Sequence, residues 1–228
     1  MELMRTFPDA LIIASGIFAL LTMSMPYGIF FGSMIESSLI FRAMRYVTKA
    51  LNIGMPETSK VGKNSDSTTV MLNASKSVMC RTGFTHPTIN SLSIFGSNTM
   101  DSTFPSAPIF MLSTASAYLF GSLNHLSAEL QALGPSYSSR YYISAILLML
   151  LIFIFSAFRI LQGCESIGTI ILTIPFGLIL GFVLIQQNSR LFGEQSVNLI
   201  GIPLLRNRTA SGKNLYVCSA RATGSAST

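Results

Sequence analysis

The sequence predicts a mainly α-helical integral membrane protein with about three transmembrane helices, two of which form a hairpin. An interfacial amphipathic helix, a polar extended loop and a small C-terminal β-hairpin complete the predicted fold. Only 11% of the 228 residues are charged and 50% are hydrophobic, whereas about a quarter of the residues in a soluble domain are charged. The mean hydropathy is +0.54. Three stretches also lack charge over about 20 residues, the length that a helix needs to cross a bilayer.

The first uncharged stretch lies between Asp9 and Glu36 and predicts an N-terminal transmembrane anchor over residues 1–35. The leader before it holds two acidic residues and a single arginine, so it lacks the positive region of a signal peptide. Pro26 also interrupts a stretch that is already longer than a signal core. We therefore expect an uncleaved anchor, with a buried core helix as the alternative.

Residues 36–54 predict a basic amphipathic helix at the membrane interface. Its apolar positions fall on one face and its basic positions on another: Ile40, Met44, Val47 and Leu51 against Arg42, Arg45 and Lys49. A helix of this kind beside a span commonly lies in the headgroup layer. Arg42, Arg45 and Lys49 are therefore candidate contacts for anionic lipid headgroups. The alternative is a continuation of the span with a solvated basic face.

The next two segments are less apolar. Residues 55–104 are rich in Ser, Thr, Asn and Gly without a helical or alternating period, which predicts a polar extended loop that is ordered only against a partner. Residues 105–140 predict a weakly apolar interfacial segment. Three spans place thirteen Lys and Arg on one side of the membrane and two on the other, whereas a fourth span at 104–126 gives seven and eight. The positive-inside rule therefore favours three spans, with residues 32–140 on the cytosolic side.

Residues 141–185 predict a transmembrane helical hairpin, because two strongly apolar stretches are joined by the short sequence "RILQGCE". The second of these stretches carries small residues at every fourth position, which places them on one helix face: Thr169, Thr173, Gly177 and Gly181. The last two form a GxxxG pattern that permits close helix packing. The expected packing partner is the other helix of the hairpin, and a second copy of the chain is the alternative.

The C-terminal tail, residues 186–228, keeps an ordered pattern after the last span. A turn is expected at Gly193 and Glu194. The segments "IPLLRNR" and "NLYVCSA" flank "TASGK", which predicts a juxtamembrane β-hairpin followed by a disordered end. Two strands alone are only marginally stable in water. The hairpin is therefore expected to rest on the bilayer, on the 36–54 helix or on a partner protein.

No catalytic, cofactor or metal site is predicted, so the chain is not expected to be an enzyme. His86 and His125 belong to no ligand cluster, and no complete phosphate-binding loop is present. The predicted spans contain no ionisable residue, which argues against a pump or coupled transporter but not against a passive pore made by oligomerisation.

The cysteines and glycosylation sequons complete the sequence predictions. Cys80, Cys164 and Cys218 are far apart and odd in number, so they are expected to be isolated thiols in a reducing compartment or small apolar residues. The two sequons, at Asn73 and Asn207, fall on the predicted cytosolic side, where both would stay unmodified.

One resemblance adds a biological setting. The phrases "AYLFGSLNHLSAELQALGPSYSSRYY", "RILQGCE" and "QNSRLFGEQSVNLIGIPLLRNRTASGKNLYVC", in this order around two apolar spans, resemble membrane proteins of large icosahedral DNA viruses, the chlorella-virus relatives in particular. The similarity covers about residues 115–218. It implies a minor capsid or inner-membrane protein of the virion that lies beneath a jelly-roll capsid shell.

The resemblance and the sequence together predict a structural protein that tethers the internal virion membrane to the capsid shell. Its expected partners are the bilayer and capsid proteins, with self-association as a further expectation and no role for nucleic acid. During assembly the expected location is a host-derived, endoplasmic-reticulum-like membrane. The alternatives are a small passive channel or transporter-like protein, and a membrane-remodelling assembly factor.

Overall fold

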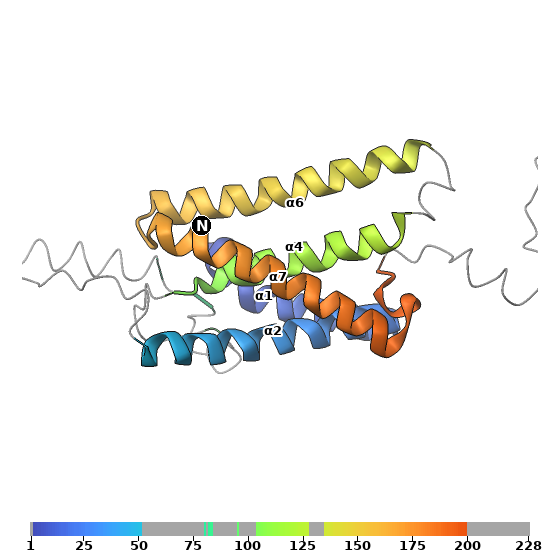
Figure 1. The fold of residues 1–228 in the computed structure, drawn as a ribbon, viewed down its shortest axis with the longest axis horizontal. Coiled ribbons are helices and arrows are strands. Elements are labelled where there is room, and N and C mark those ends of the chain that lie inside the picture. Colours follow the sequence, from blue (N-terminus) through green and yellow to red (C-terminus); the bar gives the residue numbers. More distant parts are fainter. Residues whose placement is uncertain are drawn as a thin grey trace, which may run out of the picture.

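The computed structural model describes residues 2–51, 80, 82–83, 95, 104–127 and 135–199. These residues are mainly helical, and no strand occurs among them. Five long helices lie side by side (Figure 1) and are followed by one short 3₁₀ turn: α1 (Glu2–Thr22), α2 (Met25–Ala50), α4 (Ala107–His125), α6 (Pro135–Leu161), α7 (Ile167–Phe192) and η2 (Glu194–Val197). The predicted C-terminal β-hairpin falls after residue 199 and lies outside the described residues.

The five helices alternate in direction along the chain. Phe18 on α1 stacks on Tyr27 of α2, directly across the turn that joins them, so these two helices are antiparallel. The α2 helix is likewise antiparallel to α4, because its last turn bonds to the chain just before α4, where the Thr48 hydroxyl donates to the Phe104 carbonyl oxygen at 3.0 Å. The α6 helix starts beside the end of α4, where Tyr141 donates to Asn124 at 3.3 Å.

Because the helices alternate in direction, the ends of several elements lie together at each end of the bundle. The Cys164 end holds the start of α1, the end of α2, the start of α4 and the α6–α7 turn. The Val197 end holds the α1–α2 turn, the end of α4, the start of α6 and η2 (Figure 1). Residues far apart in the sequence therefore meet at each end.

The N-terminal region differs from the prediction of one anchor followed by a separate interfacial helix. The α1 helix ends at Thr22, Met23 adopts a left-handed conformation with φ 46°, and α2 then continues without a break past residue 36 to Ala50. Pro26 starts this second helix rather than interrupting the first one. Proline is well tolerated in the first helical turn, where its missing N–H has no intrahelical partner to lose.

The α4 helix corrects the prediction of an interfacial segment over residues 105–140. Fourteen of its residues are buried, and it packs against α7, α6, α2 and α1, so it is the central helix of the bundle. Its many Ala and Ser residues lower its hydropathy, yet they also let neighbouring helices approach it from several sides. A hydroxyl of α4 can also be satisfied within the helix: the Thr114 hydroxyl donates to the Phe110 carbonyl oxygen at 2.8 Å.

The α6 and α7 helices turn their apolar side chains outward. Residues Tyr141–Leu161 and Ile167–Phe192 are long and apolar enough to cross a membrane, and only 22% and 33% of their most apolar windows are buried. The core helix of a soluble protein would be mostly buried, so that alternative is disfavoured for both. The two helices are antiparallel as predicted for a hairpin, but each packs mainly against α4 rather than against the other.

Candidate membrane-embedded core and its two ends

The predicted small-residue face of α7 lies against α4. Thr169, Thr173, Gly177 and Gly181 are all buried. A Cβ atom added to Gly177 would lie 2.8 Å from the Phe110 carbonyl oxygen of α4, and one added to Gly181 would collide with the Thr114 carbonyl oxygen. The GxxxG pattern thus brings two helix backbones into direct contact. The partner is α4, whereas the sequence had suggested α6.

Thr173 of this face adds a polar link between α7 and the start of α4. The Thr173 hydroxyl accepts a hydrogen bond from the Ser106 backbone N–H at 3.2 Å, just before α4 begins. It also donates to the Thr169 carbonyl oxygen at 2.6 Å. One hydroxyl therefore satisfies an otherwise orphan N–H at the helix start, which would be costly to leave unpaired away from water. Ser166 caps α7 by accepting from the Thr169 N–H at 3.1 Å.

A second polar cluster lies towards the Val197 end of the core. The side-chain amide of Asn188 donates to the Ser33 hydroxyl at 2.7 Å and to the Tyr118 hydroxyl at 3.0 Å. These three buried residues come from α7, α2 and α4. No sequence pattern marks this cluster, because an asparagine near the predicted end of a span is ordinarily an interfacial residue. It fixes the register of three helices at once.

The chain after α7 turns back and packs against the Val197 end of the bundle. Gly193 has φ +83°, a conformation that favours glycine, and this turn agrees with the one expected at Gly193 and Glu194. Val197 and Leu199 are then buried against the helices. The Ser122 hydroxyl of α4 donates to the Val197 carbonyl oxygen. The first residues of the predicted tail are therefore part of the core.

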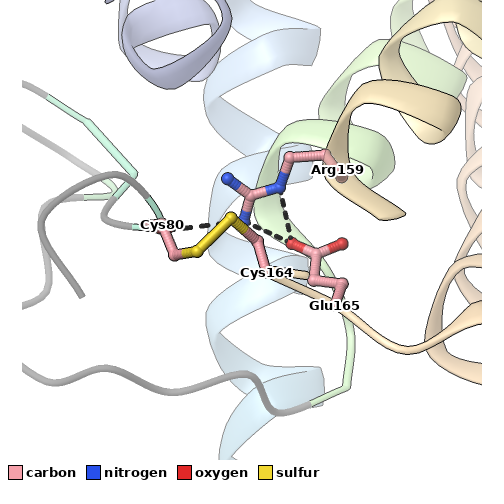
Figure 2. The surroundings of a disulfide bond; sticks show 4 residues. All are labelled: Cys80, Arg159, Cys164 and Glu165. Atoms are coloured by element: carbon pink, nitrogen blue, oxygen red, sulfur yellow. Dashed lines mark hydrogen bonds and ion pairs between the residues drawn. A yellow bond between two sulfur atoms is a disulfide. The ribbon is translucent and has the colours of Figure 1, made fainter. Parts of the chain in front are cut away.

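The opposite end of the bundle is closed by a disulfide bond between Cys80 and Cys164 (Figure 2). This bond corrects the prediction that both residues are isolated thiols. The two cysteines are 84 residues apart, so their spacing gave no sign of the pairing. Only the fold, which brings Cys80 against the α6–α7 turn, places them together.

A buried ion pair lies beside the disulfide. Arg159, in the last turn of α6, donates through Nε and Nη2 to the same carboxylate oxygen of Glu165, at 3.1 and 2.5 Å, and both side chains are about 5% exposed. Figure 2 shows the guanidinium lying between the Glu165 carboxylate and the disulfide. Its Nη2 also donates to the Cys80 carbonyl oxygen at 3.5 Å. The arginine therefore contacts both segments that the disulfide joins, at Cys80 and at Glu165 of the α6–α7 turn.

The chain before α4 also contacts the bundle at Phe95. Its backbone N–H donates to the buried carboxylate of Asp9 at 3.1 Å, and its ring packs against Phe41 with centroids 5.4 Å apart. The sequence predicted that residues 55–104 would be ordered only against a partner. At the few positions of this loop that the structure describes, the partner is the helical bundle itself.

The predicted headgroup residues lie on α2 near the Cys164 end. Arg42 is exposed and Arg45 is half-buried, while the side chain of Lys49 lies outside the described residues. The apolar face predicted for this helix is its core face only in part. Met44 packs against the core, whereas Val47 is 52% exposed. Phe41 and Thr48, which do not belong to the predicted face, are buried.

In the part of the chain that the structure describes, no group of three or more His, Cys, Asp and Glu side chains is placed to hold a metal ion. His125 ends α4, and His86 lies outside this part. The arrangement supplies interhelical hydrogen bonds, a buried ion pair and a covalent crosslink. Comparison of the chain with protein-family models, with curated proteins and with solved structures finds no match.

Proposed function

We propose that this chain is an integral membrane protein with a structural, non-catalytic role, and that it tethers the internal membrane of a virion to the capsid shell. The observation that carries the membrane part is the inverted surface of the bundle. Large apolar side chains on α6 and α7 face outward, while hydroxyl, amide and charged groups are buried: Ser33, Ser37, Thr114, Thr173, Asn188 and Arg159. Such a surface would promote aggregation in water and is suited to lipid.

The length of the helices also supports insertion. The α7 helix has 26 residues and α6 has 27, which correspond to about 40 Å of helix at 1.5 Å per residue. The hydrocarbon core of a bilayer is about 30 Å thick. Both helices can therefore cross it and leave a polar turn at either end, such as the amides and Arg190 at the end of α7.

The tether part is supported by the resemblance of residues 115–218 to inner-membrane proteins of large icosahedral DNA viruses, which supplies the class of partner, a capsid protein. The bundle supplies a well-packed anchor, whose α4 helix has fourteen buried residues. Residues 200–228 follow the last described residue of this anchor and are the candidate docking segment.

The packing of α4 favours this role over a passive channel within one chain. A pore through the bundle would have to run along its axis, which α4 fills with fourteen buried residues. The membrane-remodelling alternative depended on an independent amphipathic helix over residues 36–54. These residues belong to the continuous helix α2, whose Phe41 and Thr48 are part of the core.

Truncation of the tail tests the proposal. Removal of residues 200–228 spares Val197 and Leu199, so the bundle should still insert into membranes and resist extraction by alkaline carbonate. We expect the truncated chain to be lost from purified particles, as quantified by mass spectrometry, while the full chain is retained at a fixed ratio to capsid protein. Equal incorporation of both chains would overturn the tether role of the tail, and absence of the full chain from particles would overturn the virion role.

A further inference from the structure

We infer that the Cys164 end of the bundle faces an oxidising compartment and that the Val197 end faces the cytosol. This inference rests on the proposed function, because sidedness has meaning only if the bundle spans a membrane. It reverses the assignment that the positive-inside rule gave to residues 32–140. It also decides which extramembrane segment can meet the capsid shell.

The path of the chain places both cysteines at one end of the bundle. The Cys80–Cys164 bond joins the chain before α4 to the α6–α7 turn, so both cysteines lie on one side of the membrane. The predicted three-span arrangement places residue 80 and residue 164 on opposite sides and cannot accommodate this bond. In the bundle the five helices alternate in direction, which brings the end of α2, the start of α4 and the α6–α7 turn to the same end.

The distribution of charge does not decide the orientation of this bundle. In this arrangement, the chain at the Cys164 end carries nine basic residues: Arg5, Arg42, Arg45, Lys49, Lys60, Lys63, Lys76, Arg81 and Arg159. The chain at the Val197 end carries six: Arg140, Arg190, Arg206, Arg208, Lys213 and Arg221. The difference is small, and it depends on the long 52–103 loop, which is close to the length where the positive-inside rule weakens.

The disulfide indicates which end of the bundle faces the cytosol. Cytosolic thiols are kept reduced, and the disulfides that do form there are usually transient and exposed for catalysis or sensing. Cys164 is only 6% exposed, and Arg159 holds the backbone of Cys80 beside it. These features fit a permanent structural crosslink. A crosslink of this kind is made and kept on the non-cytosolic side of a membrane.

Formation of the bond needs an oxidant, for which a thiol–disulfide oxidoreductase of that compartment is sufficient. The thiolate of one cysteine attacks the oxidoreductase disulfide and forms a mixed disulfide with one of its sulfur atoms. The second thiolate then displaces that sulfur, and the Cys80–Cys164 Sγ–Sγ bond forms. Two electrons and two protons pass to the oxidoreductase, whose disulfide becomes two thiols.

This orientation has two consequences for the chain. The segment after Leu199 leaves from the cytosolic side, where a capsid shell would assemble, so the docking segment is the tail rather than the 52–103 loop. The Asn73-Ala-Ser75 sequon enters the compartment in which glycans are added, whereas Asn207-Arg-Thr209 does not. The sequence alone had placed both sequons on the cytosolic side.

The three native cysteines allow a direct test in the full-length chain. The chain is translated into sealed endoplasmic-reticulum microsomes and treated with a membrane-impermeant maleimide without reductant. We expect labelling of Cys218 that falls to background in C218S. Cys80 and Cys164 should react only after detergent and reductant have both been added. A mass shift that is removed by endoglycosidase and absent from N73Q should accompany this pattern.

The opposite results are equally distinct. Protection of Cys218 in sealed microsomes, or labelling of Cys80 and Cys164 without detergent and reductant, would overturn the inference. A glycan on Asn207 in place of Asn73 would do the same. Release of the chain by alkaline carbonate would overturn the proposed membrane function itself, so the two failures can be told apart.

Discussion

Asn188 of α7 and Tyr118 of α4 are joined by a buried hydrogen bond of 3.0 Å, and the same Asn188 amide reaches Ser33 of α2. The shared amide links three helices that are far apart in the sequence. In a membrane, an unpaired polar group has no water to bond with, so the buried Asn188 amide depends on Ser33 and Tyr118 as acceptors. This relationship makes the Val197 end of the core sensitive to single substitutions.

The substitution N188A should destabilise the bundle by about 1–2 kcal/mol, because interhelical hydrogen bonds in membranes contribute on this scale. Equilibrium unfolding in mixed detergent micelles, followed by circular dichroism, measures the change. The matched control is Q186A, which removes an exposed amide from the same helix turn. Equal stability of the two variants would show that the Asn188 cluster contributes nothing to the fold.

The substitution G181A should cost about 1–3 kcal/mol, the usual range for overpacking a well-packed core. The new methyl group would meet the Thr114 carbonyl oxygen and would lie 2.6 Å from the Ala117 Cβ atom, so α4 and α7 would have to separate. G168A in the same helix has only the Ser166 hydroxyl, at 3.9 Å, near its new methyl group and is expected to be neutral or slightly stabilising. The same unfolding assay compares them, and no difference between the variants would contradict the direct contact of α4 and α7.

Removal of one partner of the Arg159–Glu165 pair should be more damaging than removal of both. R159M alone leaves a buried carboxylate without its counter-ion, which typically costs about 3–5 kcal/mol. The double variant R159M/E165L removes both charges and should recover most of this loss. A double-mutant cycle on thermal stability in detergent checks the prediction, and simple additivity of the two single variants would refute the coupling.

Loss of the disulfide should destabilise the bundle by about 2–5 kcal/mol, as is typical for a native disulfide. The variants C80S and C164S should give the same loss, and the double variant should be no worse than either, because each single change already breaks the bond. C218S is the matched control and should leave stability unchanged. Unfolding with and without reductant provides the measurement, since reductant should affect only the chains that keep both cysteines.

A charge reversal tests the predicted lipid contacts of α2. R42E should weaken co-sedimentation of the reconstituted chain with added vesicles rich in anionic lipid, since each basic residue near such a surface contributes about 1 kcal/mol. The loss should disappear in high salt, where the interaction is screened. K213E, in the tail at the other end of the chain, is the control, and equal losses for both variants would argue against a specific role of α2.

The sequence by itself determined the mainly helical class of this protein and its most apolar helices. Low charge and long uncharged stretches predicted helices over 141–185, and the four-residue spacing of Thr169, Thr173, Gly177 and Gly181 identified the packing face of α7. Both inferences depend on local composition and helical period, which can be read from a single segment of the chain. The same kind of reasoning suggested a turn at Gly193, where only a local backbone conformation is at issue.

The tertiary structure decided the number of helices in the bundle, the partners of each face and the polar contacts of the core. The hydropathy of α4 is modest because it contains small and hydroxyl-bearing residues, which favour close helix packing. A hydropathy scale measures preference for an apolar solvent, so it does not detect this packing role. Cys80 meets Cys164, and Asn188 meets Tyr118, only because the helices alternate in direction. Contacts of this kind are set by the path of the chain in space, which no local pattern of residues records.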